Sequence, residues 1–237
     1  MSRPRFTWTA LPRVEIWILL AVVAVTGALA AFAALADEVG EGETGRIDQA
    51  ILLAFREPGH PDIPIGPRWI QEAARDVTAL GGFTVLVLVS LAAIALLLIH
   101  RRRLQALVFG LTVTTAQLGS ELLKTWIDRP RPAIVDHLDL VYSSSFPSGH
   151  AMMTPAIYLT LAGILAAGER TRREKALLVG GAAALSVAVG VSRVYLGVHW
   201  PTDVLGGWML GAAIALAATV ILRRTAPRRE PAVTPAG

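Results

Sequence analysis

Residues 79–99 read ALGGFTVLVLVSLAAIALLLI and contain no charged side chain. An α-helix of this length can cross a hydrocarbon core of about 30 Å. Five more runs of mostly apolar residues lie at 14–36, 104–123, 149–167, 176–195 and 203–222. Backbone polar groups inside a bilayer must be paired within the segment, so each run is predicted to be a helix. The predicted fold class is an all-α membrane protein with six transmembrane helices.

The overall composition supports a membrane protein. Of the 237 residues, 54% are hydrophobic and 17% are charged, whereas soluble domains are about 45–50% apolar and about 25% charged. The chain has no cysteine, which excludes a disulfide framework and a thiolate metal site. Residues 14–36 could belong to a signal peptide, with Ala34-Leu35-Ala36 as its cleavage site. Their apolar length exceeds the 7–15 residues of a signal core and favours an uncleaved helix.

The basic residues predict how the chain is oriented in the membrane. Fourteen of the 22 Lys and Arg residues fall on one predicted side, namely Arg3, Arg5, Arg13, Arg101, Arg102, Arg103, Arg170, Arg172, Arg173, Lys175, Arg223, Arg224, Arg228 and Arg229. Cytoplasmic loops carry such an excess, so both termini are expected in the cytoplasm. The membrane itself is expected to be the inner or plasma membrane of the cell. Topology thus explains the net charge of +4, and no nucleic-acid partner is expected.

The long connection and the C-terminus complete the predicted organisation. Residues 37–78 are acidic and rich in Gly and Pro, with two amphipathic stretches at 47–56 and 68–80. These stretches are predicted to be short interfacial helices of the first extracytoplasmic loop, forming either a cap over the bundle or a lid beside a site. Residues 1–224 are expected to form one domain, followed by a disordered cytoplasmic tail at 225–237.

Three polar motifs follow or precede apolar runs on the predicted extracytoplasmic side. They are KTWIDRPRP at 124–132, PSGH at 147–150 and SRVYLGVHWPTD at 192–203. The first supplies Lys124 and two Arg-Pro pairs at Arg129 and Arg131. Arg binds phosphate oxygens through two N–H groups, while Lys acts as a point charge. The residues alone do not choose between the two Arg-Pro pairs.

The second and third motifs supply histidines at helix ends. Ser148 and Gly149 open a predicted helix, where free N–H groups and the helix dipole attract anions. His150 has an ordinary pKa of about 6.5, which suits a general acid. Asp203 can bind one ring nitrogen of His199 and leave the other free to attack. Each feature alone is also typical of an ordinary helix cap.

Together the motifs resemble the type 2 phosphatidic acid phosphatase (PAP2) superfamily, whose pattern is K-x6-RP, PSGH and SR-x5-H-x3-D. Residues 124–203 match every position of that pattern. The resemblance implies that His199 is the nucleophile, Asp203 orients it, and His150 protonates the leaving oxygen. It selects Arg131 over Arg129 and implies no metal or other cofactor. The implied phosphate cradle comprises Lys124, Arg131, Ser148, Gly149 and Arg193.

The expected function is therefore hydrolysis of a phosphorylated lipid at the outer leaflet of the membrane. The candidate substrates are a polyprenyl diphosphate, phosphatidate and phosphatidylglycerol phosphate. One alternative is a vanadate-dependent haloperoxidase, which shares the oxyanion cage, but those proteins are soluble and six spans argue against it. A second is a non-catalytic lipid-phosphate binding or transport protein, which the intact histidine pair disfavours.

Overall fold

The computed structural model describes residues 13–141, 143–168 and 170–225. The predicted tail from 226 onward lies outside these residues, and Thr225 ends the last helix. The elements in chain order are α1 (Arg13–Glu41), α2 (Gly45–Leu53), β1 (Arg56–Glu57), β2 (His60–Pro64), α3 (Arg68–Ala79), α4 (Phe83–Ile99), α5 (Arg103–Ile127), α6 (Gly149–Ala166), α7 (Arg172–Tyr195) and α8 (Pro201–Thr225).

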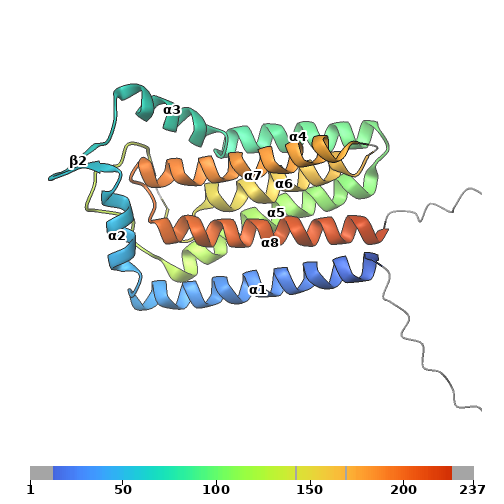
Figure 1. The fold of residues 1–237 in the computed structure, drawn as a ribbon, viewed down its shortest axis with the longest axis horizontal. Coiled ribbons are helices and arrows are strands. Elements are labelled where there is room, and N and C mark those ends of the chain that lie inside the picture. Colours follow the sequence, from blue (N-terminus) through green and yellow to red (C-terminus); the bar gives the residue numbers. More distant parts are fainter. Residues whose placement is uncertain (1–12, 142, 169, 226–237) are drawn as a thin grey trace, which may run out of the picture.

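Six long helices run side by side as a bundle, with α6 at its centre (Figure 1). Helix α6 packs against α5, α7 and α8, and α1 lies against the outer side of α8. The centre of the bundle is filled by apolar side chains such as Phe109, Met152 and Ile157. Most other large apolar side chains of the outer helices are exposed, which is the pattern of a bundle surrounded by lipid.

Helices occur at all six predicted runs, but the number of candidate membrane spans depends on one bent pair of helices. Five helices are long and apolar enough to cross a membrane, and α3 with α4 counts as a sixth span if the pair is taken together. Those two helices are bent by 41°. The predicted span at 79–99 therefore starts late, at Phe83, because Gly81 and Gly82 separate it from α3. Two adjacent glycines favour such a break since they disfavour continued helix.

The connection between α1 and α4 lies over one end of the bundle (Figure 1). Short helices occur at both predicted stretches: α3 covers nearly all of the second, whereas α2 ends at Leu53 and the predicted end of the first stretch at 56 lies in β1. The sequence did not predict the antiparallel hairpin of β1 and β2 between them. Gly59 in the hairpin turn has a φ of +82°, a conformation that glycine adopts without steric cost.

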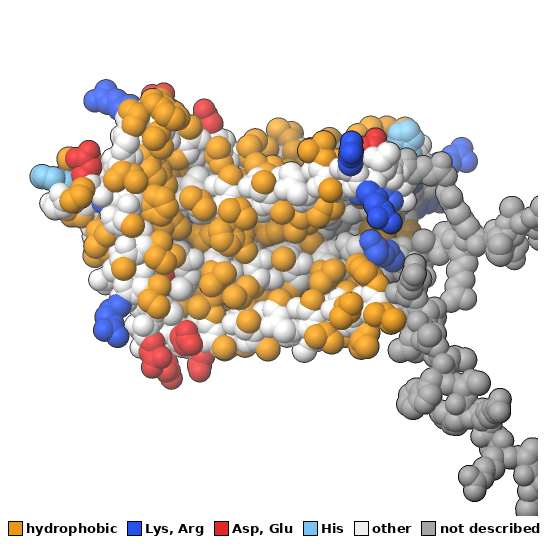
Figure 2. Space-filling model, in the orientation of Figure 1, with side chains coloured by type: hydrophobic (Ala, Val, Ile, Leu, Met, Phe, Trp, Pro, Cys, Tyr) orange, Lys and Arg blue, Asp and Glu red, His pale blue; other side chains and the backbone are white. Residues whose placement is uncertain are grey.

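The surface divides the molecule into an apolar band and two polar ends. Figure 2 shows apolar side chains along the length of the helices and Lys and Arg side chains gathered at the end where α8 finishes. The α4–α5 and α6–α7 connections both lie at that end (Figure 1). The other end carries α2, the hairpin and the loops that contain the three motifs. The motifs thus lie away from the densest positive charge, as the charge pattern predicts.

Candidate active site

All eight residues predicted for the site meet at this second end of the bundle. Their positions follow from where the helices begin and end. Lys124 is in the last turn of α5, and Arg193 is in the last turn of α7. His150 and Asp203 lie in the first turns of α6 and α8, and the rest are Arg131, Ser148, Gly149 and His199. Residues up to 79 positions apart along the chain are thereby brought together by four helix ends.

His199 and Asp203 form the buried pair that the sequence predicts. His199 Nδ1 lies 3.3 Å from Asp203 Oδ2, and the two side chains are 2% and 0% exposed. Burial lowers the pKa of His199 to about 4; Arg131 and Arg193 act in the same direction, whereas Asp203 opposes them. The imidazole is therefore neutral at neutral pH. With Nδ1–H directed at the carboxylate, Nε2 keeps its lone pair.

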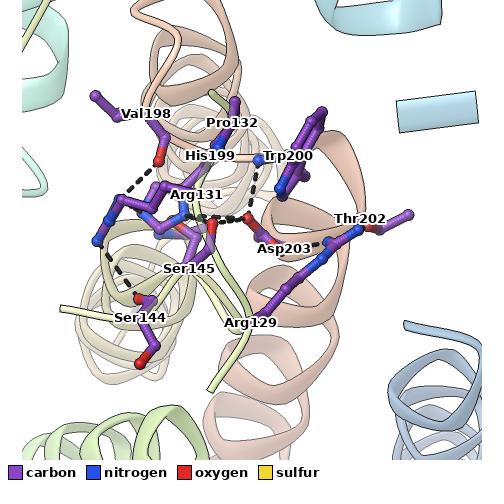
Figure 3. A network of polar contacts seen from close by, with 12 residues as sticks. Arg129, Arg131, Pro132, Ser144, Ser145, Val198, His199, Trp200, Thr202 and Asp203 are labelled. Carbon is purple, nitrogen blue, oxygen red and sulfur yellow. Dashed lines mark hydrogen bonds and ion pairs between the residues drawn. The ribbon is translucent and has the colours of Figure 1, made fainter. Parts of the chain in front are cut away.

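The Asp203 carboxylate is fully hydrogen-bonded (Figure 3). Its Oδ2 accepts hydrogen bonds from the Ser145 hydroxyl and from the Trp200 backbone N–H, the latter at 2.8 Å. Its Oδ1 accepts a hydrogen bond of 2.6 Å from Arg129 Nη1. A buried carboxylate needs such partners to remain ionised. The aspartate is thus held in one orientation, with Oδ2 toward the imidazole.

Arg131 lies on the opposite side of the His199 ring from Asp203. Its Nη1 donates to Val198 O at 2.6 Å and lies 3.3 Å from His199 Nε2, and its Nε donates to Ser143 O at 2.7 Å. Burial lowers the pKa of Arg131 to about 10, and Arg193 acts in the same direction, so the guanidinium stays protonated at neutral pH. A cation is therefore fixed beside the free nitrogen of the imidazole (Figure 3).

Lys124 and the start of α6 form the facing wall of the site. Lys124 Nζ donates to the Ser143 hydroxyl at 3.1 Å. A Cβ at Gly149 would lie 3.5 Å from Lys124 Nζ and 3.3 Å from Ser120 Oγ, so glycine keeps the ammonium close to the helix N-terminus. Ser148 caps α6 by accepting from Ala151 N–H. This wall presents N–H groups and a positive charge to an anion.

His150 lines a cavity that opens between α4, α5 and α6. The cavity has a volume of about 260 Å³. Its polar lining comprises Gln117, Ser120, Glu121, Lys124 and His150, and its apolar lining comprises Phe83, Leu86, Val87, Val113, Met153 and Ile157. The imidazole lies within electrostatic range of Lys124, Arg131, Arg193 and His199. A lining with both polar and apolar parts suits an amphipathic ligand.

Arg193 is the third cation of the site and is held from two sides. It is 2% exposed, and its Nη1 donates to the Thr78 hydroxyl at 3.1 Å and to Asp139 Oδ2 at 2.5 Å. Asp139 belongs to the loop that connects α5 to α6. The Nε of Arg193 is buried and has no hydrogen-bond partner among the residues described. The guanidinium therefore retains donor capacity for an anion in the site.

Several residues of the site were not predicted from the sequence. Ser143, Ser145 and Asp139 contact Lys124, Asp203 and Arg193 respectively. The run of three serines at 143–145, separated from PSGH by Phe146 alone, was a usable signal, since hydroxyls beside an anion site can donate to it. The motif spacing leaves Arg129 out of the predicted phosphate cradle, and in the structure its guanidinium donates to Asp203.

Comparison with known proteins identifies the family. The family model described as "PAP2 superfamily" matches residues 105–226, about half of the chain. The chain belongs to the PAP2 superfamily. It is 37% identical over 146 residues to phosphatidylglycerophosphatase B of Bacillus subtilis, covering 60% of this chain and 70% of the relative. It is 36% identical over 138 residues to decaprenylphosphoryl-5-phosphoribose phosphatase of Mycobacterium tuberculosis, covering 54% of this chain and 66% of the relative.

A solved PAP2 structure has the same overall arrangement. It is the crystal structure of the transmembrane PAP2-type phosphatidylglycerolphosphate phosphatase from Bacillus subtilis, with a TM-score of 0.75 and 29% sequence identity. The match covers 87% of this chain and 98% of that chain. This PAP2 protein is therefore a multi-pass membrane enzyme of the lipid phosphatase class. The non-catalytic alternative is thereby set aside.

Proposed function

We propose that this PAP2 protein hydrolyses a lipid phosphate or diphosphate through a phosphohistidine, without a metal ion, at the extracytoplasmic face of the membrane. The observation that carries the proposal is the His199 ring, whose Nδ1 lies 3.3 Å from Asp203 Oδ2 and whose Nε2 lies 3.3 Å from Arg131 Nη1. This arrangement leaves a neutral imidazole with its lone pair directed toward a cation that can hold the phosphoryl oxygens.

In the first step of the proposed reaction, the lone pair of His199 Nε2 attacks phosphorus. The bond from phosphorus to the lipid oxygen breaks, and His150 donates a proton to that oxygen. Asp203 accepts the Nδ1–H hydrogen bond and stabilises the positive charge that develops on the ring. In the second step His150 takes a proton from water, the hydroxide displaces His199 from phosphorus, and inorganic phosphate leaves.

The remaining residues of the proposed cradle neutralise charge on the phosphoryl group. Lys124, Arg131 and Arg193 all lie within electrostatic range of His150, and the N-terminus of α6 adds N–H groups. Phosphoryl transfer depends mainly on such positioning and charge stabilisation. The cavity of about 260 Å³, which reaches Lys124, Gly149 and His150, would receive the first carbons of the lipid chain against its apolar walls.

Replacement of His199 by Ala tests the proposed nucleophile. We expect phosphate release to fall to background in H199A, while the protein remains folded in detergent as judged by its size-exclusion profile and Tm. Brief incubation of the wild-type enzyme with substrate labelled by ³²P should give acid-labile, base-stable label on the protein, and H199A should give none. Near-normal turnover in H199A would refute this assignment.

Two further points, metal independence and substrate preference, are tested with the same purified protein. We expect activity to survive EDTA and to be blocked by vanadate, which mimics a five-coordinate phosphoryl group. Magnesium-dependent recovery after EDTA would contradict the mechanism. The substrate panel comprises phosphatidylglycerol phosphate, phosphatidate and polyprenyl diphosphates, compared by kcat/KM. Phosphatidylglycerol phosphate leads the panel because the relative from Bacillus subtilis is named for it.

A further inference from the structure

Arg129 lies in a buried network that connects α2 to the first turn of α8. Its Nη1 donates to Asp203 Oδ1 at 2.6 Å and to the Thr202 hydroxyl at 2.8 Å. Its Nη2 donates to Asp48 Oδ2 at 2.6 Å and to the Thr44 hydroxyl at 3.0 Å. The Arg129 side chain is 11% exposed and the two carboxylates are 0% exposed. Both ends of the guanidinium fork are therefore used within the protein, and Figure 3 shows Arg129 beside Asp203 and Thr202.

Asp48 is the residue of α2 that completes this network. Its Oδ1 accepts from Thr202 N–H at 2.9 Å, and its Oδ2 accepts from the Thr202 hydroxyl at 2.7 Å as well as from Arg129. A carboxylate that is fully buried needs all of these donors. Asp48 therefore fixes both Arg129 and the start of α8, the turn that carries Asp203.

The network determines which oxygen of Asp203 faces the imidazole. A carboxylate is planar, and Arg129 holds Oδ1 on the side away from His199. Oδ2 is then left to His199, Ser145 and Trp200. Without Arg129, Oδ1 would lose its charged donor and the carboxylate could rotate, which would loosen the tautomer and the direction of the imidazole.

The charges of the network matter as well as its geometry. One guanidinium is shared between two carboxylates, so the trio of Arg129, Asp48 and Asp203 keeps a net charge of about −1. If Asp48 were neutral, Arg129 would cancel the charge of Asp203. The carboxylate would then stabilise the positive ring of a phosphorylated His199 less. Asp48 therefore preserves the negative potential at the imidazole, although it does not touch it.

We propose that Arg129 and Asp48 are positioning residues of the reaction, acting through Asp203 on His199, and that α2 is a fixed support of the active site. This inference rests on the proposed role of His199. Two further contacts fix the same connection to the end of α7: Arg56 Nη1 donates to Tyr195 O at 3.0 Å, and the Tyr195 hydroxyl donates to Ile65 O at 2.9 Å. Because these contacts hold the connection in place, they favour a fixed support at α2 over the alternative of a lid.

The variants D48N and R129K test the proposal. A third variant, R129Q, removes the positive charge of Arg129 as well as its forked shape. D48N keeps the shape of the side chain and removes its charge, and R129K keeps the charge and loses the fork. We expect kcat to fall roughly tenfold to a hundredfold, while KM changes less than threefold. The expected loss is of the order found when the hydrogen-bond partner of a metal-binding histidine is removed. The matched controls D62N and R46Q remove exposed charges from the same connection and should leave kcat within about twofold.

The pH profile of kcat/KM separates positioning from a merely structural role. The charged or titratable groups that face His199 are Asp203, Arg131, Arg193 and His150. Loss of the cation in R129Q should move the acid limb of the profile to higher pH, since the imidazole then sees more negative charge. D48N should move it in the opposite direction. Opposite movements would support the proposal, and an unmoved limb in both variants would overturn it.

Folding and catalysis are distinguished by two more measurements. D48N and R129K are studied at a temperature at least 15 °C below their Tm, so that the folded protein is compared. A lowered Tm with kcat within twofold of the wild type would overturn the proposal, because the network would then serve stability alone. The variant H199A is assayed in parallel: activity in H199A would refute the phosphohistidine itself, whereas an inactive H199A with an unaffected D48N would refute only the positioning role.

Discussion

At the scale of single residues, the burial of His199 has a consequence for stability as well as for chemistry. Its pKa of about 4 in the folded protein lies below the value of about 6.5 expected in an unfolded chain. Between these values the unfolded state binds a proton that the folded state does not. The free energy of unfolding therefore falls as the pH decreases from about 6.5 toward 4 and is unaffected above that range, with a total effect of about 3 kcal/mol.

The variant H199Q tests this difference, since it cannot take up the proton. We expect the Tm of the wild-type protein in detergent to fall by several degrees more than that of H199Q between pH 7.5 and pH 4.5. The experiment is carried out without substrate, so that ligand binding does not contribute. Equal losses in the two proteins would show that the imidazole is already protonated in the fold at the lower pH.

Residues could be predicted where chemistry restricts both their type and their spacing. The cations, the two histidines and Asp203 belong to short motifs next to helix ends, and the structure brings these residues together. Asp48 and Asp139 could not be predicted, because their partners Arg129 and Arg193 lie 81 and 54 positions away. No local pattern marks such a pair.

At the scale of elements, the close contact of α6 and α8 depends on the glycines of α8. A Cβ at Gly207 would lie 2.7 Å from Ser148 O and 2.9 Å from Ala151 Cβ, so alanine there would force the helices apart. Ser148 N–H also donates to Asp203 O at 3.0 Å. The GxxxG at 207–211 thus holds the start of α6 against the first turn of α8, as small residues do in membrane bundles.

The variant G207A should therefore lose both stability and activity. We expect a Tm lower by several degrees and a kcat reduced at least tenfold, because the start of α6 must shift by a few tenths of an ångström or more. G180A is the matched control on α7, where a Cβ would meet nothing within 4 Å. It should keep full activity and a Tm equal or higher, since alanine favours helix over glycine by up to ~1 kcal/mol. Similar behaviour of the two variants would exclude the proposed packing role.

Helices could be predicted where one apolar or periodic run of residues determines them. The apolar runs gave the long helices, but their ends extend beyond those runs, as α5 does to Ile127 and α1 does to Glu41. Polar residues can continue a helix outside the hydrocarbon, so hydropathy alone does not mark its end. The hairpin of β1 and β2 was missed because residues 56–64 contain two prolines besides Pro58 and lack strand alternation.

At the scale of the whole molecule, the two ends of the bundle differ in charge and in polar structure. One end carries the loops with the excess of Lys and Arg, and the other carries the buried polar networks around His199 (Figures 1 and 2). The helices between them are apolar on their outer faces. A bilayer around this band would place every polar network of the site at one interface, where the phosphate of a lipid lies and its chain can remain among the helices.

The proposed orientation can be measured directly, because the chain contains no cysteine and each introduced thiol is therefore unique. Leu140 is 79% exposed in the loop beside the site, and Arg102 is exposed in the turn between α4 and α5. In intact cells that express L140C, a membrane-impermeant maleimide should label the protein. R102C should be labelled only after the membrane is opened, because the positive charge of its turn favours the cytoplasm. Both variants should retain phosphatase activity, since neither residue contacts the catalytic groups. Labelling of R102C in intact cells together with protection of L140C would place the active site in the cytoplasm and would contradict the assignment to the outer leaflet.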